Sequence, residues 1–353
     1  MAKKKGKKTF FKKVIIALGL IVLIGGLGSA YWAYRIIYKP NVSLNGKKST
    51  YIYIPTGATF EVVKTVLYNN NFISNHASFE WLAERKHYTR KIKPGKYFIK
   101  DDMSNNELID LLRSGKQEPV RVTFTTARTK GELVAKIHGQ LEADSSELIA
   151  LLNDDAYLSK YGLGKENILT LFIPNTYEFY WNTSAKKFID KMADEYKKFW
   201  TAERKAKANS IGYSQTEISV LASIVQSETY VDKEKPMIAG VYMNRLNKRM
   251  PLQADPTLIW ALGDFTIKRV LSAYKQIDSP YNTYRNLGLP PGPICLPSVT
   301  SLDAVLNYKK HNYIYFCAKE DFSGYSNFAR TYEQHLQNAR RYQQALNKRK
   351  ILK

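Results

Sequence analysis

An apolar run near the N-terminus constrains this chain more than any other feature. Residues 14–34 read VIIALGLIVLIGGLGSAYWAY and contain no charged side chain. A helix rises about 1.5 Å per residue, so this run covers the roughly 30 Å hydrocarbon core of a bilayer. A cleaved signal peptide would have a shorter apolar core and a small-residue cleavage site, which residues 28–30 (GSA) resemble. The aromatic residues Tyr31, Trp32 and Tyr34 follow at once, as at a membrane interface, and favour an uncleaved anchor.

The charges on either side of this run predict its orientation. Seven lysines lie within the first thirteen residues, whereas Arg35 and Lys39 are the only cations close behind the run. By the positive-inside rule, the N-terminus stays in the cytosol. No second apolar run of spanning length follows, so we expect a single-pass protein with nearly all its mass on the outer side of the membrane.

The formal net charge is +23, and +16 remains after the seven tail lysines are subtracted. Such a balance raises nucleic acid as a partner, but export argues against it, and we expect none. An anionic wall polymer or an anionic lipid headgroup fits the charge as well. A well-solvated basic surface that needs no partner also remains open.

The two cysteines, Cys295 and Cys317, both lie in apolar surroundings. Outside the cytosol one disulfide can form, and two buried free thiols are the alternative. Neither the cysteines nor the five scattered histidines suggest a metal site, and no phosphate-binding glycine loop or Ser-His-Asp arrangement stands out. We therefore predict no cofactor and no metal.

The first exported segment has the pattern of a small mixed unit. Residues 51–55 alternate like a strand, helices are expected after residue 59 and over 78–85, and KPGKYFI (93–99) reads as a second strand. Ser104 and Glu107 form a capping box for a helix through residue 112. The pattern predicts a strand-helix-helix-strand-helix unit, reached by a short extended linker.

A second unit begins near residue 120 with a strand over 120–124. Apolar periodicity predicts helices over 130–142 and 145–153, and one long amphipathic helix over 184–207.

One carboxylate has an unusual position in this second unit. Ser214 and Glu217 form a capping box that opens a helix with a buried apolar stripe. The stripe consists of Ile218, Leu221, Ala222 and Val225. Glu228 returns to the edge of the stripe, where partial desolvation would raise its pKa and suit it to donate a proton near neutral pH. Alternatively, the helix ends at Thr229 and Glu228 points into solvent.

Four polar or proline-bound segments follow closely: VYMNRL (241–246), LQADPT (252–257), SPYNTY (279–284) and GLPPGPI (288–294). Loops rich in Asn, Asp, Thr and Tyr can line a sugar cleft, because sugar hydroxyls need many hydrogen-bond partners. Loops of this composition can also be plain turns.

These segments, together with ASIVQSET (222–229) and LFIPNTYEF (171–179), resemble in order and spacing the motifs of the YceG-like endolytic murein transglycosylases. The resemblance covers nearly the whole exported chain and implies that the first unit is LysM-like. It also implies an inner-membrane protein of a bacterium whose catalytic domain is periplasmic or extracellular. Its partners would be peptidoglycan glycan strands and, by family resemblance alone, cell-wall synthases.

The resemblance assigns the catalytic role to Glu228. Many relatives carry two glutamates in this segment, but here the first position is Gln226, an amide that cannot supply a proton. Ser326 stands where relatives often have a histidine, so it cannot act as an imidazole. The implied substrate-binding residues are Asn244, Gln253, Asp255, Thr257, Tyr281, Asn282 and Thr283.

The implied reaction is non-hydrolytic cleavage between N-acetylmuramic acid and N-acetylglucosamine, which leaves a 1,6-anhydro end. A hydrolase would need a second carboxyl group, about 5 Å away for retention or about 6.5–9.5 Å for inversion, and Asp255 is the candidate. A non-catalytic wall-binding scaffold is the alternative from another class. The anchor would confine the enzyme to nascent strands near the bilayer, where cleavage would terminate their elongation.

Together these patterns predict an α+β protein with an N-terminal transmembrane helix, a small α/β subdomain and a larger mixed α/β catalytic domain. The predicted segments are a basic cytosolic tail (1–13), the anchor (14–36), a linker (37–49), the LysM-like subdomain (50–117), the catalytic domain (118–345) and a basic tail (346–353).

Overall fold

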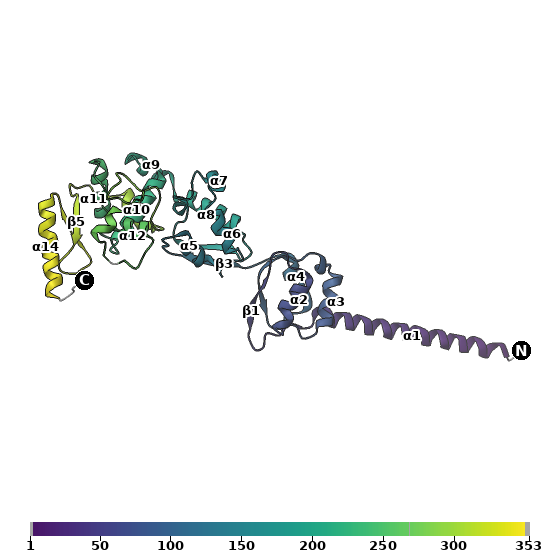
Figure 1. The fold of residues 1–353 in the computed structure, drawn as a ribbon. Coiled ribbons are helices and arrows are strands. Elements are labelled where there is room, and N and C mark those ends of the chain that lie inside the picture. The colour runs from purple at the N-terminus through teal and green to yellow at the C-terminus, as the bar shows by residue number, and fades with distance from the viewer. Residues whose placement is uncertain (1–2, 268, 350–353) are drawn as a thin grey trace. The chain divides into compact units, whose positions relative to one another are not determined.

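The computed structural model describes residues 3–267 and 269–349 (Figure 1). The chain forms two compact units. Unit 1 runs to Val120 and includes residues 179–182, and unit 2 comprises residues 121–178 together with the chain from Thr183 onward. Helices and three two-stranded sheets make up both units, which confirms the predicted α+β class.

The N-terminal apolar run is part of one helix, α1 (Lys3–Tyr38). Its segment Phe10–Tyr38 is long and apolar enough to cross a membrane, and it is the one helix of this kind in the described part of the chain. Its large apolar side chains are exposed; Ile21, for example, is 66% exposed. Residues 1–2 of the predicted basic tail lie outside the described residues.

Unit 1 has the predicted order of strands and helices. Its elements are β1 (Ser49–Ile54), α2 (Phe60–Asn69), α3 (His76–Arg85), the short helix η1 (Tyr88–Arg90), β2 (Gly95–Lys100) and α4 (Asn105–Ser114). The two strands pair antiparallel, with Ile52 opposite Tyr97, and both side chains enter the core. The predicted capping box forms at the start of α4 between Ser104 and Glu107.

Residues 37–49, predicted as an extended linker, pack onto unit 1, and the ends of this range belong to α1 and β1. The backbone N–H groups of Asn41 and Val42 both donate to the carbonyl oxygen of Met103, and Val42 is buried in the core of unit 1. The Asn41 side chain donates to Asn105 Oδ1 over 2.7 Å. A buried asparagine needs such partners, and their positions far along the chain are not visible in the local sequence.

Unit 2 is larger and mainly helical. Its first elements are β3 (Pro119–Phe124, which begins two residues before the unit), α5 (Lys130–Ile137), α6 (Ser145–Leu151), α7 (Asp155–Leu158), η2 (Ser159–Tyr161), η3 (Ile168–Leu171), β4 (Asn175–Tyr180, whose last two residues belong to unit 1), α8 (Ala185–Phe199) and α9 (Ala202–Ser210). The remaining elements are α10 (Gln215–Glu228), α11 (Lys235–Asn247), α12 (Asp255–Leu262), η4 (Ser272–Gln276), α13 (Val299–Leu306), β5 (Tyr315–Ala318), β6 (Ser326–Ala329) and α14 (Tyr332–Lys348).

Three predicted boundaries in unit 2 need correction. The helix expected over 184–207 is two helices, because Trp200 leaves the helical conformation and is buried, and the Thr201 hydroxyl caps the next helix. The helix from residue 130 ends at Ile137 rather than at residue 142. Residues 346–348 of the predicted C-terminal tail belong to α14, and residues 350–353 lie outside the described residues.

Helix α10 lies at the centre of unit 2 and packs against α11, α12 and α13. The predicted capping box at Ser214 and Glu217 is present. All residues from Ile218 to Val225 are buried, so the helix is covered on every side and not only along the predicted stripe. Ser223 meets this burial by donating to the carbonyl of Val220 and accepting from the N–H of Ile294. The helix is therefore a rigid support for the residue at its end.

Candidate functional site

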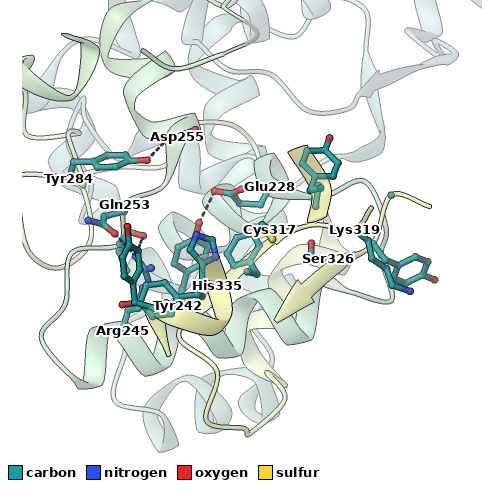
Figure 2. A pocket seen from close by; sticks show the side chains of 18 of the residues that line it. Glu228, Tyr242, Arg245, Gln253, Asp255, Tyr284, Cys317, Lys319, Ser326 and His335 are labelled. Carbon is teal, nitrogen blue, oxygen red and sulfur yellow. Dashed lines mark hydrogen bonds between the residues drawn. The ribbon is translucent and has the colours of Figure 1, made fainter. Parts of the chain in front are cut away.

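The end of α10 opens into a cavity of about 650 Å³ (Figure 2). Glu228 is the last residue of the helix because Thr229 takes an extended backbone, with φ −147° and ψ 142°. Residues from α11, α12 and the 279–284 segment form one part of the wall, and β5, β6 and α14 form the other. The side chain of Glu228 is thus presented from the C-terminal end of a fixed helix, partly shielded from solvent.

The environment of Glu228 raises its pKa to about 7. Burial is the largest cause, and the negative charge of Asp255 adds to it, whereas the hydrogen bond from Tyr242 and the charge of Arg245 act in the opposite direction. The C-terminal end of a helix also disfavours a carboxylate, because the carbonyl dipoles point toward it. The predicted desolvation of Glu228 is confirmed, and the alternative in which it points freely into solvent is wrong.

Tyr242 fixes one oxygen of this carboxyl group. Its hydroxyl donates to Glu228 Oε1 over 2.6 Å, and its side chain, on α11, is only 2% exposed. Burial, with the nearby carboxylate as a second cause, raises the pKa of Tyr242 well above its usual value, so it remains a donor. Because Oε1 is occupied, Oε2 is the oxygen left to exchange a proton with a molecule in the cavity.

Arg245 contributes a buried positive charge to the same wall. It is 7% exposed, and its guanidinium donates to the carbonyl oxygens of Ile314 (2.7 Å) and Leu252 (2.9 Å) and to Gln253 Oε1 (3.2 Å). These acceptors are neutral, so its charge acts on the carboxylates of the cavity. Sequence reasoning quoted the segment of Tyr242 and Arg245 but missed both residues, although a cation inside a largely apolar helix was an available signal.

Asp255 is the second carboxylate of the cavity and the first residue of α12. Tyr284 donates its hydroxyl to Asp255 Oδ1 over 2.5 Å, and burial raises the pKa of that tyrosine. Figure 2 shows the two tyrosine–carboxylate pairs around the cavity. The cavity therefore holds two carboxyl groups, and a tyrosine hydroxyl donates to each of them.

Two of the seven predicted substrate-binding residues line this cavity: Gln253 and Asp255. Gln253 has a positive φ of 53°, which side chains other than glycine adopt at a cost. Its backbone N–H donates to the carbonyl of Thr283, which holds this conformation.

The other five residues lie outside the cavity wall, and we do not assign them to substrate. Asn244 donates to the carbonyl oxygens of His311 (2.7 Å) and Tyr313 (2.9 Å), which fixes the chain ahead of β5. Asn282 is fully buried and donates to the carbonyls of Lys275 and Ile277.

Thr257, Tyr281 and Thr283 support the start of α12. The hydroxyls of Thr257 and Thr283 lie 2.8 Å apart, both buried, and Thr283 also accepts the N–H of Ala254. The ring of Tyr281 lies against Trp260, with 3.9 Å between ring centroids. The polar residues of these motifs are mainly a scaffold that places Asp255.

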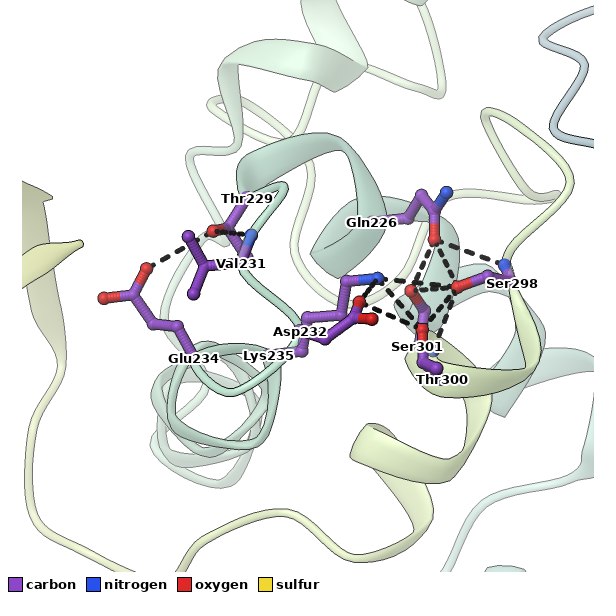
Figure 3. Close-up of polar contacts among 9 residues, drawn as sticks. All are labelled: Gln226, Thr229, Val231, Asp232, Glu234, Lys235, Ser298, Thr300 and Ser301. Carbon is purple, nitrogen blue, oxygen red and sulfur yellow. Dashed lines mark hydrogen bonds and ion pairs between the residues drawn. The ribbon is translucent and has the colours of Figure 1, made fainter. Parts of the chain in front are cut away.

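Gln226 does not line the cavity and belongs to a polar network with residues of α13 (Figure 3). Its Oε1 accepts hydrogen bonds from the hydroxyls of Ser298 (2.7 Å) and Ser301 (2.5 Å) and from the N–H of Ser298 (3.2 Å). These groups form the N-terminus of α13, so position 226 ties two helices together.

The loop after Glu228 is anchored on both sides. Glu234 accepts the N–H of Ser326 over 2.6 Å and the hydroxyl of Thr229 over 3.3 Å. Lys235, 5% exposed, pairs with Asp232 over 2.6 Å. Ser326 lines the cavity, and its backbone rather than an imidazole connects β6 to this loop.

The two cysteines are free thiols in this structure. Cys295 is buried and donates to the carbonyl of Ser223, whereas Cys317 is partly exposed and lines the cavity. Burial raises the pKa of both thiols, which makes them poor nucleophiles. Within residues 3–267 and 269–349, no group of three or more His, Cys, Asp or Glu side chains is placed to hold a metal ion.

Comparison with known proteins gives consistent matches. A sequence model of the YceG-like family matches residues 52–341. The endolytic murein transglycosylase of Bacillus subtilis strain 168 is 29% identical over 340 residues, which are 92% of each chain.

The endolytic murein transglycosylase of Streptococcus pneumoniae R6 is 28% identical over 344 residues. The match covers 88% of this chain but 61% of that relative, so this chain spans about three fifths of the pneumococcal protein. The crystal structure of a YceG-like protein from Listeria monocytogenes superposes with a TM-score of 0.54 and 26% identity, covering 83% of this chain and 99% of that one.

Proposed function

Because the chain belongs to the YceG-like family, we propose that it is an endolytic peptidoglycan lytic transglycosylase held at the membrane by α1. The observation that carries this proposal is the position of Glu228, with a pKa of about 7 at the end of a buried helix and inside a cavity. A carboxyl group with that pKa is protonated in about half of the molecules at pH 7 and can act as both acid and base.

In the proposed reaction, Glu228 first acts as the acid. The proton on Oε2 passes to the glycosidic oxygen between N-acetylmuramic acid and N-acetylglucosamine, and the bond from that oxygen to C1 breaks as an oxocarbenium-like state forms. The Glu228 carboxylate then takes the proton of the C6 hydroxyl of the N-acetylmuramic acid whose C1 has lost its bond to the glycosidic oxygen. The C6 oxygen bonds to C1, which gives the 1,6-anhydro end, restores the acid and consumes no water.

The chain's own residues support both halves of this cycle. Tyr242 holds Oε1, so the carboxyl group keeps one orientation while it loses and regains its proton. Arg245 favours the carboxylate formed after the first step, and Asp255 favours the protonated form before it. Asp255 also brings a negative charge to the cavity that would stabilise the positive charge developing at C1.

Asp255 is also the reason to retain a second candidate, hydrolysis by two carboxyl groups. It lines the same cavity as Glu228 and is close enough to raise its pKa. A hydrolase would need Asp255 as nucleophile or base, but one of its oxygens accepts from Tyr284. This arrangement supports an electrostatic role, so we place the transglycosylase first.

The end groups of the products distinguish the candidates. Full-length protein in detergent would be incubated with purified polymeric glycan, and the product ends identified by mass spectrometry. The transglycosylase gives 1,6-anhydro ends, the hydrolase gives reducing ends, and a wall-binding scaffold gives no cleavage. Undiminished cleavage by Glu228→Gln would contradict our assignment of the acid.

We further propose that α1 spans the cytoplasmic membrane of a bacterium with its N-terminus in the cytosol, so that the cavity meets nascent glycan outside the cell. The seven lysines before the apolar run support this orientation. The strand-helix-helix-strand order of unit 1 supports a LysM-like role in holding glycan. Cell-wall synthases remain proposed partners by family membership alone.

A further inference from the structure

Unit 1 contains a second hollow, of about 470 Å³, whose lining is positively charged. It is lined by Trp81, Glu84, Arg85, His87 and Arg90. The guanidinium of Arg85 lies over the ring of Trp81, with 4.8 Å to its centroid. The lining therefore combines two arginines and a histidine with one glutamate and an indole. This combination suits an anionic group next to an apolar surface.

This hollow is fixed to the end of α1. Helix α3, which carries Trp81 and Arg85, packs beside α1, as Figure 1 also shows. The ring of Trp32 on α1 meets the ring of Trp81 edge to face, with 5.3 Å between centroids. Asn105 donates to the carbonyl of Ile36 over 2.9 Å, and that isoleucine packs against the core of unit 1. No free linker separates the anchor from the hollow.

The contact between Trp32 and Trp81 gives the depth of the hollow in a membrane. Trp32 lies two residues before the end of the uncharged run 14–34, which is the interfacial position that tryptophan prefers. Trp81 must lie at about the same depth because the rings touch. Arg85 follows one helical turn later on α3, and Arg35 and Lys39 are exposed on and just after α1.

We propose that unit 1 docks on the outer surface of the bilayer, where the Arg85–Arg90 hollow binds the phosphate groups of anionic phospholipids. This inference rests on the proposed anchoring of α1 and goes beyond the proposed catalytic activity. Trp81 inserts beside Trp32 at the interface, and Arg85 and Arg90 pair with lipid phosphates. Unit 1 then lies on the membrane and does not swing freely above it.

Amide hydrogen exchange of the full-length protein in lipid nanodiscs tests this proposal. One set of discs contains phosphatidylcholine alone, and the other also contains phosphatidylglycerol. We expect exchange over residues 76–90 to be roughly 30-fold slower with the anionic lipid, as two cations near an anionic surface would provide. Arg85→Glu with Arg90→Glu should remove the difference between the two discs.

The matched control is Lys187→Glu with Lys205→Glu, which makes the same charge change at exposed positions of α8 and α9. The control should keep the slow exchange in anionic discs. Equal exchange of the parent in both discs, or a lipid effect that survives the arginine reversal, would overturn the proposal. Exchange at the buried residues Leu108, Ile109 and Leu112 reports whether unit 1 is folded, and Arg85→Gln with Arg90→Gln replaces the reversal if it is not.

Glycan cleavage in detergent separates this proposal from the catalytic one. The arginine variants should still cleave there and give the same end groups as the parent, because the Glu228 cavity lies in unit 2. Failure of the parent to cleave glycan would refute the proposed activity and leave the lipid measurement unaffected.

Discussion

Helices α1 and α10 both contain a central apolar stretch, yet α1 exposes these side chains and α10 buries them. The large apolar residues of α1 up to Leu27 are exposed, whereas α10 is buried from Ile218 to Val225 under α11, α12 and α13. The difference teaches that apolar composition alone does not assign a helix to a core or to a membrane. Length and the presence of covering helices distinguish a membrane helix from a core helix. Of these two helices, only the covered one can hold a charged group in a fixed, desolvated place.

The largest effect should come from the residue that depends on this burial. Glu228→Gln removes the proton donor but keeps the shape of the side chain, so cleavage should fall by about 10²–10⁴-fold, as for loss of a general acid. The rate of release of glycan ends measures it. The control is Glu217→Gln, the same change at the exposed other end of α10, which should cleave within about twofold of the parent. Equal losses in both variants would point to damage of the helix rather than of the chemistry.

A leucine truncation in each helix should have opposite outcomes. Leu221→Ala in α10 should lower the free energy of unfolding of unit 2 by about 2–5 kcal/mol, because it leaves a cavity in a closely packed core. Leu20→Ala in α1, where the side chain is 52% exposed, should leave it unchanged. Denaturant unfolding in detergent, followed by the fluorescence of Trp200 and Trp260, measures both. Similar losses would show that Leu20 also packs against protein.

The burial of Glu228 should cost stability at high pH. Its pKa of about 7 when folded lies above the ordinary 4.5, so the folded state binds the proton more tightly than the unfolded state. The resulting stabilisation is fully present below about pH 4.5 and is lost as the pH rises through 7. Glu228→Gln should therefore be more stable than the parent at pH 8 by at most about 3 kcal/mol. Denaturant unfolding of both proteins at pH 5 and pH 8 tests this. The gain in unfolding free energy of Glu228→Gln over the parent should be larger at pH 8 than at pH 5.

The smallest effect should come from the phenol that holds the carboxyl group. Tyr242→Phe removes a hydrogen bond to the carboxylate, so the pKa of Glu228 should rise by about one unit. Because the protonated form starts the reaction, the loss of activity at alkaline pH should move upward by the same amount. Tyr284→Phe, which removes the hydrogen bond to Asp255 instead, is the matched control and should shift the alkaline loss of activity by less. If Tyr242→Phe loses activity at the same alkaline pH as the parent, Tyr242 has only a packing role.

Local periodicity predicted most helices and strands, including the order of unit 1 and both capping boxes, because these depend on neighbouring residues. Local periodicity failed where contacts with residues distant in the sequence determine the local structure. Residues around Asn41 look like a linker until Met103 and Asn105 meet them. The helix break at Trp200 depends on the burial of a ring that fits a helical pattern as well as it fits a break.

The same reason limits the prediction of the site. Glu228 followed from its position on a helix, and Gln253 and Asp255 came with the resemblance of their segment. Polar side chains such as Thr257 and Asn282 were expected to face substrate, but hydrogen bonding inside the protein uses the same chemical groups. The sequence shows which polar side chains are present, but it does not show whether each one points toward substrate or into the protein.

The packing of Ile36 and the hydrogen bonds of Asn41 join the end of the anchor directly to the core of unit 1. A membrane helix adapts to bilayers of different thickness mainly by changing its tilt. Since packed and hydrogen-bonded contacts join α1 to α3 and α4, a change in the tilt of the helix should turn unit 1 with it. The thickness of the surrounding bilayer therefore sets the orientation of unit 1 at the membrane surface.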